Sequence, residues 1–441
     1  MRGVRSLSCF SKRCYAAARR TDALTEPLAL QKTSTAAAPI TPQNVQVSKL
    51  PNGLVIASLE NYSPMSSVGV FVKAGSRYEG LESQGVSHVL RLAANLTTKG
   101  VSAFKLCRSV ESMGGSLRVV VLDSLLDFLV NVTTAQEFRP WEVDELTSRV
   151  KVDKALAEQS VIEKLHEAAY KNALSNSLYC PDYMVGHISS QQLQMFVEDN
   201  FTTSRMALVG LGVNHSILRQ VGEGLLSVRS GPGAPGAKAV YRGGEMRLQN
   251  SDDLVHSLVV SEAAMTGSAE ANAFSVLQRI LGAGPHVKRG TSSTSKLSQG
   301  IAKATTQPFD ATAFNSSYSD SGLFGVYTIA HADSAGEVIK AAVTQVRAVA
   351  EGSVSEADIT RAKNQVKAEY LMSLETSESL MEEIGAQALS TAAYQAPESV
   401  LQGVDAITQA DVVKAAKQFV DGKKTMASCG HLINTPFVDE L

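Results

Sequence analysis

The sequence His166-Glu167-Ala-Ala-Tyr170 is one residue short of a zinc-binding motif. Many zinc peptidases place two histidines four positions apart on a helix, with a glutamate beside the first histidine that activates water. Tyr170 stands where the second histidine is needed, so one of the metal ligands is missing. We therefore interpret His166 as an ordinary helical residue.

Other patterns that carry chemistry are missing or incomplete. The five cysteines, at positions 9, 14, 107, 180 and 429, form no CxxC pair and have no evident histidine partner, and no GxSxG occurs. The segment SGPGAPGAKA (230–239) contains GxGxxG by letter, but its two prolines remove backbone donors that a dinucleotide needs. We interpret this segment, rich in Gly, Pro and Ala, as an exposed linker.

A more informative segment is KAGSRYEGLESQGVSHVLRLAANLTTKG (73–100). Together with LPNGLVIAS (50–58), it resembles the opening of the pitrilysin-type (M16) zinc peptidases. In active members of that family the motif HxxEH supplies two zinc ligands and a glutamate that polarises water, and a later glutamate is the third ligand. By this resemblance His88 is the first histidine, Arg91 stands at the glutamate position and Leu92 stands at the second histidine position.

These two departures predict that the chain is not an enzyme. Arginine stays protonated at any ordinary pH, so Arg91 cannot take a proton from water, and its charge would repel zinc. Leu92 has no lone pair, and His88 alone cannot hold a zinc ion that normally needs three protein ligands. The third ligand should fall within 147–158, where Asp153 lies among basic residues, but the sequence does not place it. We expect no catalytic residue, no metal and no cofactor bound by this chain.

The chain is built as a duplication. ISSQQLQMFVEDNFTTSRMALVG (188–210) and ITQADVVKAAKQFVDGKKTMASCG (407–430) each predict a capped amphipathic helix, a polar turn and a strand. Ile188 and Ile407 lie 219 positions apart, close to half the chain, which favours duplication over chance similarity. We predict an α+β fold of two homologous halves, each a mostly antiparallel sheet with helices packed on one face. Their boundaries are 40–229 and 241–441, joined by a Gly/Pro linker at 230–240.

Local patterns place the elements within these halves. Strands are expected at 45–50 and 54–59 around Pro51-Asn52-Gly53, at 67–74, near 254–261 and near 311–330. Helices are expected at 85–96, 141–175, 268–281, 335–350 and 356–389. After 114–121 the family pattern continues into a second strand and turn, which this chain lacks, and a shorter gap lies near 158–160. We therefore predict that the sheet of the first half is locally short at 115–130.

The first residues have a different composition from the rest. Residues 1–20 contain six Arg or Lys, several Ser and no acidic residue, and Val4, Leu7 and Phe10 share one helical side. An Arg-rich, acid-free, amphipathic segment is typical of a mitochondrial transit peptide. In the whole chain, 41 basic against 43 acidic residues do not indicate a nucleic-acid partner, and no apolar run is long enough to span a bilayer.

Within the M16 family, two catalytically degenerate groups occur in mitochondria. One comprises the core proteins of the ubiquinol–cytochrome c reductase (cytochrome bc1, complex III), and the other the substrate-recognising alpha subunits of mitochondrial processing peptidase. Three segments resemble the core proteins: NALSNSLYCPDY (172–183), AFNSSYSDSGLFGVYT (313–328) and TPFVDEL (435–441). The alpha subunits carry a glycine-rich loop, for which the stretch 281–293 offers only Gly282, Gly284 and Gly290 as residues of a peptide-facing loop.

The first group is therefore favoured, with the alpha subunit as the alternative. The resemblance implies a non-catalytic scaffold of the respiratory chain on the matrix side of the mitochondrial inner membrane. It also implies pairing with core protein 1, and contacts with other subunits that include cytochrome b, cytochrome c1 and the Rieske protein or its presequence. Attachment to the membrane would be peripheral, through these partners.

Overall fold

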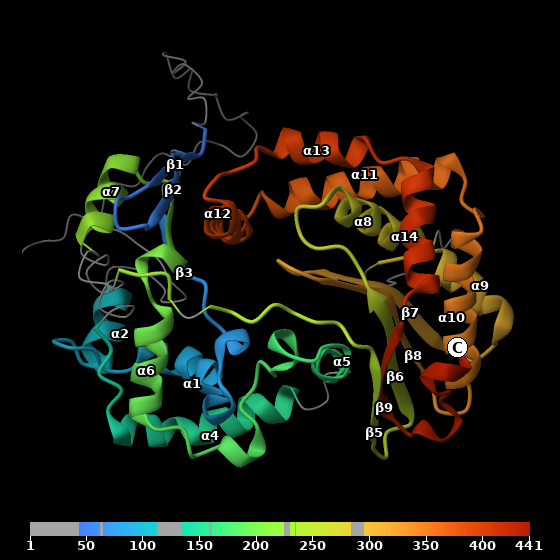
Figure 1. The fold of residues 1–441 in the computed structure, drawn as a ribbon, viewed down its shortest axis with the longest axis horizontal. Helices are drawn as coiled ribbons and strands as arrows, with labels where there is room; N and C mark the ends of the chain where they lie inside the picture. Colours follow the sequence, from blue (N-terminus) through green and yellow to red (C-terminus); the bar gives the residue numbers. More distant parts are fainter. Residues whose placement is uncertain are drawn as a thin grey trace, which may run out of the picture. The chain divides into compact units, whose positions relative to one another are not determined.

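Two β-sheets organise the computed structural model, which describes residues 44–61, 65–112, 135–157, 161–224, 230–233, 235–283 and 295–441 (Figure 1). One sheet belongs to each predicted half, and helices pack against both sheets. The α+β fold class is thus confirmed. The predicted transit peptide, the predicted short sheet at 115–130 and the gap near 158–160 lie outside the described residues.

The first sheet has four strands in the order β1-β2-β4-β3. Its strands are β1 Gln46–Lys49, β2 Val55–Leu59, β3 Ser67–Val72 and β4 Met206–Leu211. β1 and β2 form the predicted antiparallel hairpin, in which Gly53 adopts a φ of +95° that a residue with a side chain rarely accepts. β4 lies between β2, to which it is parallel, and β3, to which it is antiparallel.

The second sheet repeats this arrangement and extends it. Its strands are β5 Gly244–Gln249, β6 Leu254–Glu262, β7 Phe309–Ser317, β8 Gly322–His331 and β9 Lys424–Gly430, in the order β5-β9-β6-β8-β7. β9 is parallel to β5 and antiparallel to β6, as β4 is to β2 and β3. The strands β8 and β7 continue the sheet beyond β6. The shared pairing pattern agrees with a duplication.

Most helices begin where a side chain can satisfy their first free amides. In the first half they are α1 Val86–Leu92, α2 Ala103–Ser112, α4 Pro140–Ala157, α5 Val161–Ala169, α6 Ser190–Asn200 and α7 His215–Gly224. In the second half they are α8 Ala269–Leu281, α9 Lys296–Ala304, α10 Ala335–Ala350, α11 Glu356–Ser373, α12 Ser377–Thr391, α13 Pro397–Asp405 and α14 Gln409–Asp421. Ser189 and Thr408, at matching places in the repeat, both form capping boxes. No helix in the described ranges is both long and apolar enough to cross a membrane.

The range 356–389, expected as one helical stretch, forms two helices with different packing partners. α11 ends at Ser373, and the hydroxyl of Thr376 then caps α12. α12 leaves the second half and packs on the first sheet, where Met381, Ile384 and Ala388 contact buried residues of β2 and β4. Figure 1 shows α12 beside β2 and β3, away from α8 and α14.

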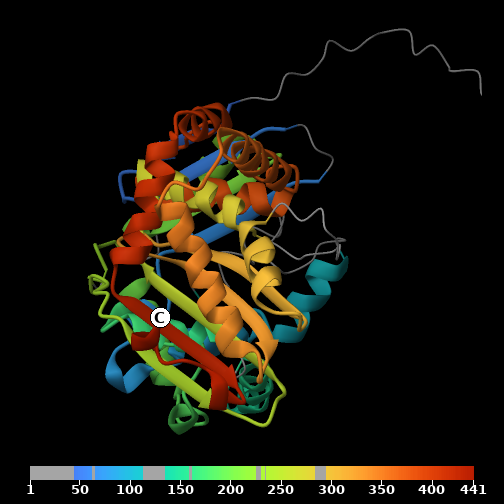
Figure 2. The same cartoon turned by 90° about the vertical axis from the view of Figure 1, so that its right-hand side faces the viewer.

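In the same way, α5 of the first half packs on the second sheet. Leu165 and Ala169 of this helix pack against Leu258, Val260 and Ala427 of the second sheet. The opposite face of that sheet is covered by α8, α10 and α14 of its own half, as Figure 2 also shows. Helices therefore cover both faces of each sheet, one face by a helix of the other half, which the predicted packing on one face did not anticipate.

The close packing of α12 on the first sheet leads to a test. A Cβ atom added to Gly385 would lie 2.5 Å from the ring of Phe71 on β3. Gly385→Val should therefore lower the free energy of unfolding, measured by urea denaturation, by about 1–3 kcal/mol because it overpacks this contact. Gly224→Val at the end of α7 is the matched control, since no atom of the described residues outside its chain neighbours and its own helix backbone lies within 4 Å of its Cβ position. An equal loss in both variants would contradict the close packing of α12.

Candidate functional site around His88

Glu79 fixes the start of the helix that carries His88. Its carboxylate accepts hydrogen bonds from the backbone N–H of Gly85 at 2.8 Å, and from the N–H and hydroxyl of Ser87 at 2.7 and 2.6 Å. Burial raises the pKa of Glu79, although these hydrogen bonds favour the charged form. Gly85 has a φ of +86°, and a Cβ there would lie 2.7 Å from the backbone of Cys180. α1 therefore starts against the loop that contains Cys180.

His88 is buried, and both of its ring nitrogens are engaged. The backbone N–H of Cys180 donates to Nδ1 at 3.1 Å, so Nδ1 carries no proton. Nε2 must then carry the proton of the neutral ring, and it donates to Oδ2 of Asp153 at 2.9 Å. His88 thus joins α1 to α4 and to the loop around residue 180.

Arg91 and Leu92 have separate structural roles. The Arg91 guanidinium donates to the same Oδ2 of Asp153 at 2.7 Å and lies 5.7 Å from the ring centre of Tyr179. The hydrogen bond from His88, together with the charge of Arg91, lowers the pKa of Asp153 below its ordinary value. Leu92 packs at the edge of an apolar cluster that includes Val89 and Leu146.

This arrangement does not fit a zinc ion. A catalytic zinc site needs about three protein ligands with free lone pairs. The Nδ1 lone pair of His88 accepts a hydrogen bond, Nε2 carries a proton, and Arg91 and Leu92 offer no ligand. Within the residues that the structure describes, no three His, Cys, Asp or Glu side chains are grouped so that they could hold a metal.

Asp153 is the residue that the sequence did not place. The sequence limited the third ligand position to 147–158, and the structure shows that Asp153 faces the His88 position from α4. A periodicity signal was available, because Val143, Leu146 and Val150 are buried and Asp153 continues their spacing of three and four residues.

A polar cavity of about 590 Å³ adjoins this network. It lies between the loop 175–183 and α5, and Glu79, Gly85 and Cys180 reach its wall. Lysine and arginine side chains balance the acidic ones around it: Lys154, Lys164, Lys171 and Arg242 against Glu79, Glu163, Glu167 and Asp182. Burial raises the pKa of the Cys180 thiol to about 11, so this group is a poor nucleophile at neutral pH.

Tyr170 also lines this cavity, and His166, one helical turn before it, is a packing residue beside Tyr318. Nδ1 of His166 donates to the backbone carbonyl of Ile162 at 2.7 Å, so Nε2 accepts a hydrogen bond from the Tyr318 hydroxyl. The Tyr170 hydroxyl is buried beside Ser321 Oγ at 3.0 Å. These contacts agree with the interpretation of His166 as an ordinary helical residue.

The predicted peptide-facing loop is described at only one of its three glycines. Gly282 ends α8, and its carbonyl accepts a hydrogen bond from Ala313 N–H at 2.7 Å. A Cβ at Gly282 would lie 2.3 Å from Ser295 Oγ, so the contact requires glycine. Gly284 and Gly290 lie outside the described residues, and a peptide-facing role for the three stays a prediction.

The His88 network predicts an order of mutational effects. Asp153→Ala should lower the free energy of unfolding by about 1–3 kcal/mol, because it leaves the buried N–H of His88 without an acceptor. Arg91→Ala should lower it by at most about 1 kcal/mol, since this side chain is more than half exposed. Urea denaturation at pH 7 measures both, and a larger effect of Arg91→Ala would contradict the central place of His88.

The lowered pKa of Asp153 adds a pH dependence. A carboxylate whose pKa is lowered on folding stabilises the protein above its unfolded pKa of about 3.9, and this stabilisation is lost as the pH falls. The difference in stability between the parent and Asp153→Ala should therefore shrink below about pH 4.

Two family descriptions match most of the chain. The description "Insulinase (Peptidase family M16)" matches residues 55–121 and 118–182, and "Peptidase M16 inactive domain" matches residues 187–366. The two segments of the first match overlap at residues 118–121, within the stretch 115–130 where the sequence predicts a short sheet.

Individual relatives extend the similarity over both halves. The chain is 58% identical over 422 residues to "Cytochrome b-c1 complex subunit 2, mitochondrial" of Mus musculus, covering 91% of this chain and 93% of that protein. Its identity to the Homo sapiens protein of the same name is 56% over 425 residues, covering 92% and 94%. A probable mitochondrial-processing peptidase subunit alpha-2 of Arabidopsis thaliana is 30% identical over 91% of this chain and 85% of its own.

A solved structure shares the fold. A chain of Complex III2 from Candida albicans, with Inz-5 bound, matches with a TM-score of 0.76 and 18% identity, over 90% of this chain and 98% of that chain. At 18% identity this match shows the fold alone, whereas the sequence matches also show the family. The chain belongs to the M16 (insulinase) family of peptidases, among the relatives of cytochrome b-c1 complex subunit 2.

Proposed function

We propose that this chain is a non-catalytic structural subunit of the mitochondrial respiratory complex III. The observation that carries the proposal is the 58% identity to a cytochrome b-c1 complex subunit 2 over nearly the full length of both chains. In this function the chain pairs with core protein 1 on the matrix side of the inner membrane. It supports the redox subunits, which include cytochrome b, cytochrome c1 and the Rieske protein, and is attached to the membrane through them.

The residues around His88 support a function without catalysis. Arg91 binds Asp153, which faces His88, and both nitrogens of His88 are engaged in structural hydrogen bonds. In this proposal His88, Arg91 and Leu92 are the degenerate positions of an ancestral zinc motif. The chain then binds no metal and no redox cofactor of its own, and electron transfer belongs to its partners.

The remaining parts of the chain complete the proposal. Residues 1–20 act as a transit peptide that directs the chain into the mitochondrion, and are rich in Arg and free of acidic residues. Residues 40–229 and 241–441 are the two peptidase-like domains, with 230–240 as their linker. Gly282, Gly284 and Gly290 belong to a loop that faces a peptide between the core subunits.

The absence of a zinc site can be tested by rebuilding it. Arg91→Glu combined with Leu92→His restores the missing ligand and the general base, so the variant should bind zinc with a Kd of about 10 μM or tighter. The affinity should stay well below that of a complete site, because zinc must displace a structural hydrogen bond of His88. Isothermal titration calorimetry on the purified chain measures the binding.

Two comparisons interpret this titration. Arg91→Gln with Leu92→Asn is the matched control, because it removes the same two side chains without supplying a good zinc ligand, and it should bind no zinc. Zinc binding and peptide cleavage by the unmodified chain would overturn the non-catalytic assignment.

Membership of complex III calls for a separate experiment. Native electrophoresis of mitochondria dissolved in mild detergent, with this chain detected by mass spectrometry, should show comigration with cytochromes b and c1. Migration as a soluble pair that cleaves presequences would instead assign the chain as an alpha subunit of the processing peptidase, to which it is more distantly similar.

A further inference from the structure

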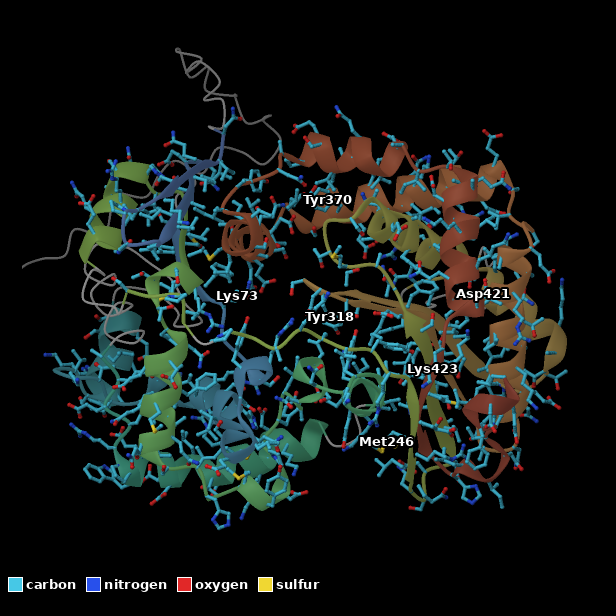
Figure 3. The ribbon with its side chains drawn as sticks, in the orientation of Figure 1. Lys73, Met246, Tyr318, Tyr370, Asp421 and Lys423 are labelled. Atoms are coloured by element: carbon cyan, nitrogen blue, oxygen red, sulfur yellow. The ribbon has the colours of Figure 1, made fainter. Side chains whose placement is uncertain are left out.

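The turn between β7 and β8 binds the first half at each of its four residues. The contacts are Tyr318 with His166, Ser319 and Asp320 with Arg77, and Ser321 with Tyr170. Tyr318 is labelled in Figure 3, close to the linker and to α5. One short turn of the second half is thus held by three side chains from two parts of the first half: Arg77, and His166 and Tyr170 in and directly after α5.

Arg77 connects this turn to the linker. Its Nη1 donates to Oδ1 of Asp320 at 2.9 Å, and its Nη2 pairs with the other carboxylate oxygen. Nε and Nη2 of the same guanidinium also donate to the backbone carbonyl of Ala237, at 3.2 and 2.7 Å. The Arg77 and Asp320 side chains are only 19% and 17% exposed, so solvent weakens this pair less than a surface pair.

Asp320 holds the linker from the other side. Its Oδ2 accepts a hydrogen bond from the backbone N–H of Ala239 at 2.8 Å. The hydrogen bond from Arg77 lowers the pKa of Asp320, so the carboxylate stays charged at neutral pH. Arg77, Asp320 and the backbone of the linker form one hydrogen-bonded cluster.

The linker needs glycines because its backbone packs closely on neighbouring side chains, rather than because it needs conformational freedom. Arg205 stacks on the ring of Tyr78 at 4.0 Å, and the linker lies against both groups. A Cβ at Gly236 would lie 2.5 Å from the Tyr78 ring, and one at Gly233 would lie 2.4 Å from Cδ of Arg205. The glycines of the GxGxxG sequence at 231–236 therefore let the linker backbone pack closely on the stacked Arg205 and Tyr78 side chains.

The end of the linker pairs with the segment that follows α5. Lys171 N–H donates to the Val240 carbonyl at 2.9 Å, and Arg242 N–H donates to the Ala169 carbonyl at 2.8 Å. Tyr170 and Tyr241 form an antiparallel bridge between these two bonds. Most of the described linker residues are exposed, as the composition predicted, but the linker is also bonded to both halves.

We propose that Arg77, the turn Tyr318–Ser321 and linker residues 235–240 form a clamp that holds the two halves permanently closed. A hinge that opens needs residues whose backbone angles can change without breaking many contacts. Here opening must break a shielded ion pair, three side-chain contacts and the backbone pairing of the linker together. The chain therefore acts as a rigid body, and this inference does not depend on its membership of complex III.

Limited proteolysis of the purified full-length chain tests the clamp. Lys238 is exposed and offers trypsin a cleavage site, but the next amide, that of Ala239, is bound by Asp320. Trypsin needs an extended segment, so it can cleave there only after the linker is released. Asp320→Asn should therefore raise the rate of cleavage after Lys238 about tenfold, because it removes a charge-assisted cluster.

Two further variants make the result specific. Asp405→Asn is the matched control, since that carboxylate binds Lys367 within the second half alone, and it should cleave at the parent rate. Gly236→Ala should raise the rate without a change of charge, because the added methyl group collides with Tyr78. Parent rates in both Asp320→Asn and Gly236→Ala would overturn the clamp.

Hydrogen exchange of the unmodified chain gives a readout that needs no variant to fold. The Ala239 amide should exchange at least about tenfold more slowly than in a free peptide, as expected for an amide released only by opening. Exchange of this amide at the rate of a free peptide would also overturn the proposal.

Discussion

The reciprocal packing of α5 and α12 is the constraint on which the rest of the structure depends. Each sheet is apolar on both faces, and its own half covers only one of them. The second face is covered by a helix from the other half: α12 on the first sheet and α5 on the second. Because the hydrophobic effect scales with the apolar area removed from water, neither half can bury its sheet completely without the other. The two halves must therefore stay associated.

This exchange also places the polar contacts between the halves. α5 brings His166 and Tyr170 to the second sheet, where they meet the turn between β7 and β8. The same turn receives Arg77, which lies just before α1 and the His88 network. Hydrogen bonds at such a boundary contribute modest net stability. They are directional, however, so they fix one relative position of two surfaces that apolar packing alone would hold less specifically.

Sequence reasoning succeeded where the signal was local. The hairpin around Gly53, the capped helices after Ser189 and Thr408, and the strands that follow them depend on residues close in the chain. It failed where an element or side chain packs against residues that lie far away in the chain. The apolar face of α12 predicts burial but does not tell which sheet it covers, and the composition of the linker predicts exposure but not the stack of Arg205 on Tyr78. The partner of Asp153 was not predicted either, since the periodicity of α4 indicates that this side chain points inward but not that it binds a histidine.

The network around His88 explains why a histidine suits a site in which Asp153 is the carboxylate that the network uses and Arg91 and Leu92 offer no ligand. Three separate pieces of chain meet there: α1, α4 and the loop around Cys180. A zinc ion joins such pieces by binding a ligand from each, and a neutral imidazole can join them as well, because it accepts with one nitrogen and donates with the other. Arg91 then balances the charge of Asp153 from the exposed side. Through these two hydrogen bonds His88 connects the three elements without a metal ion.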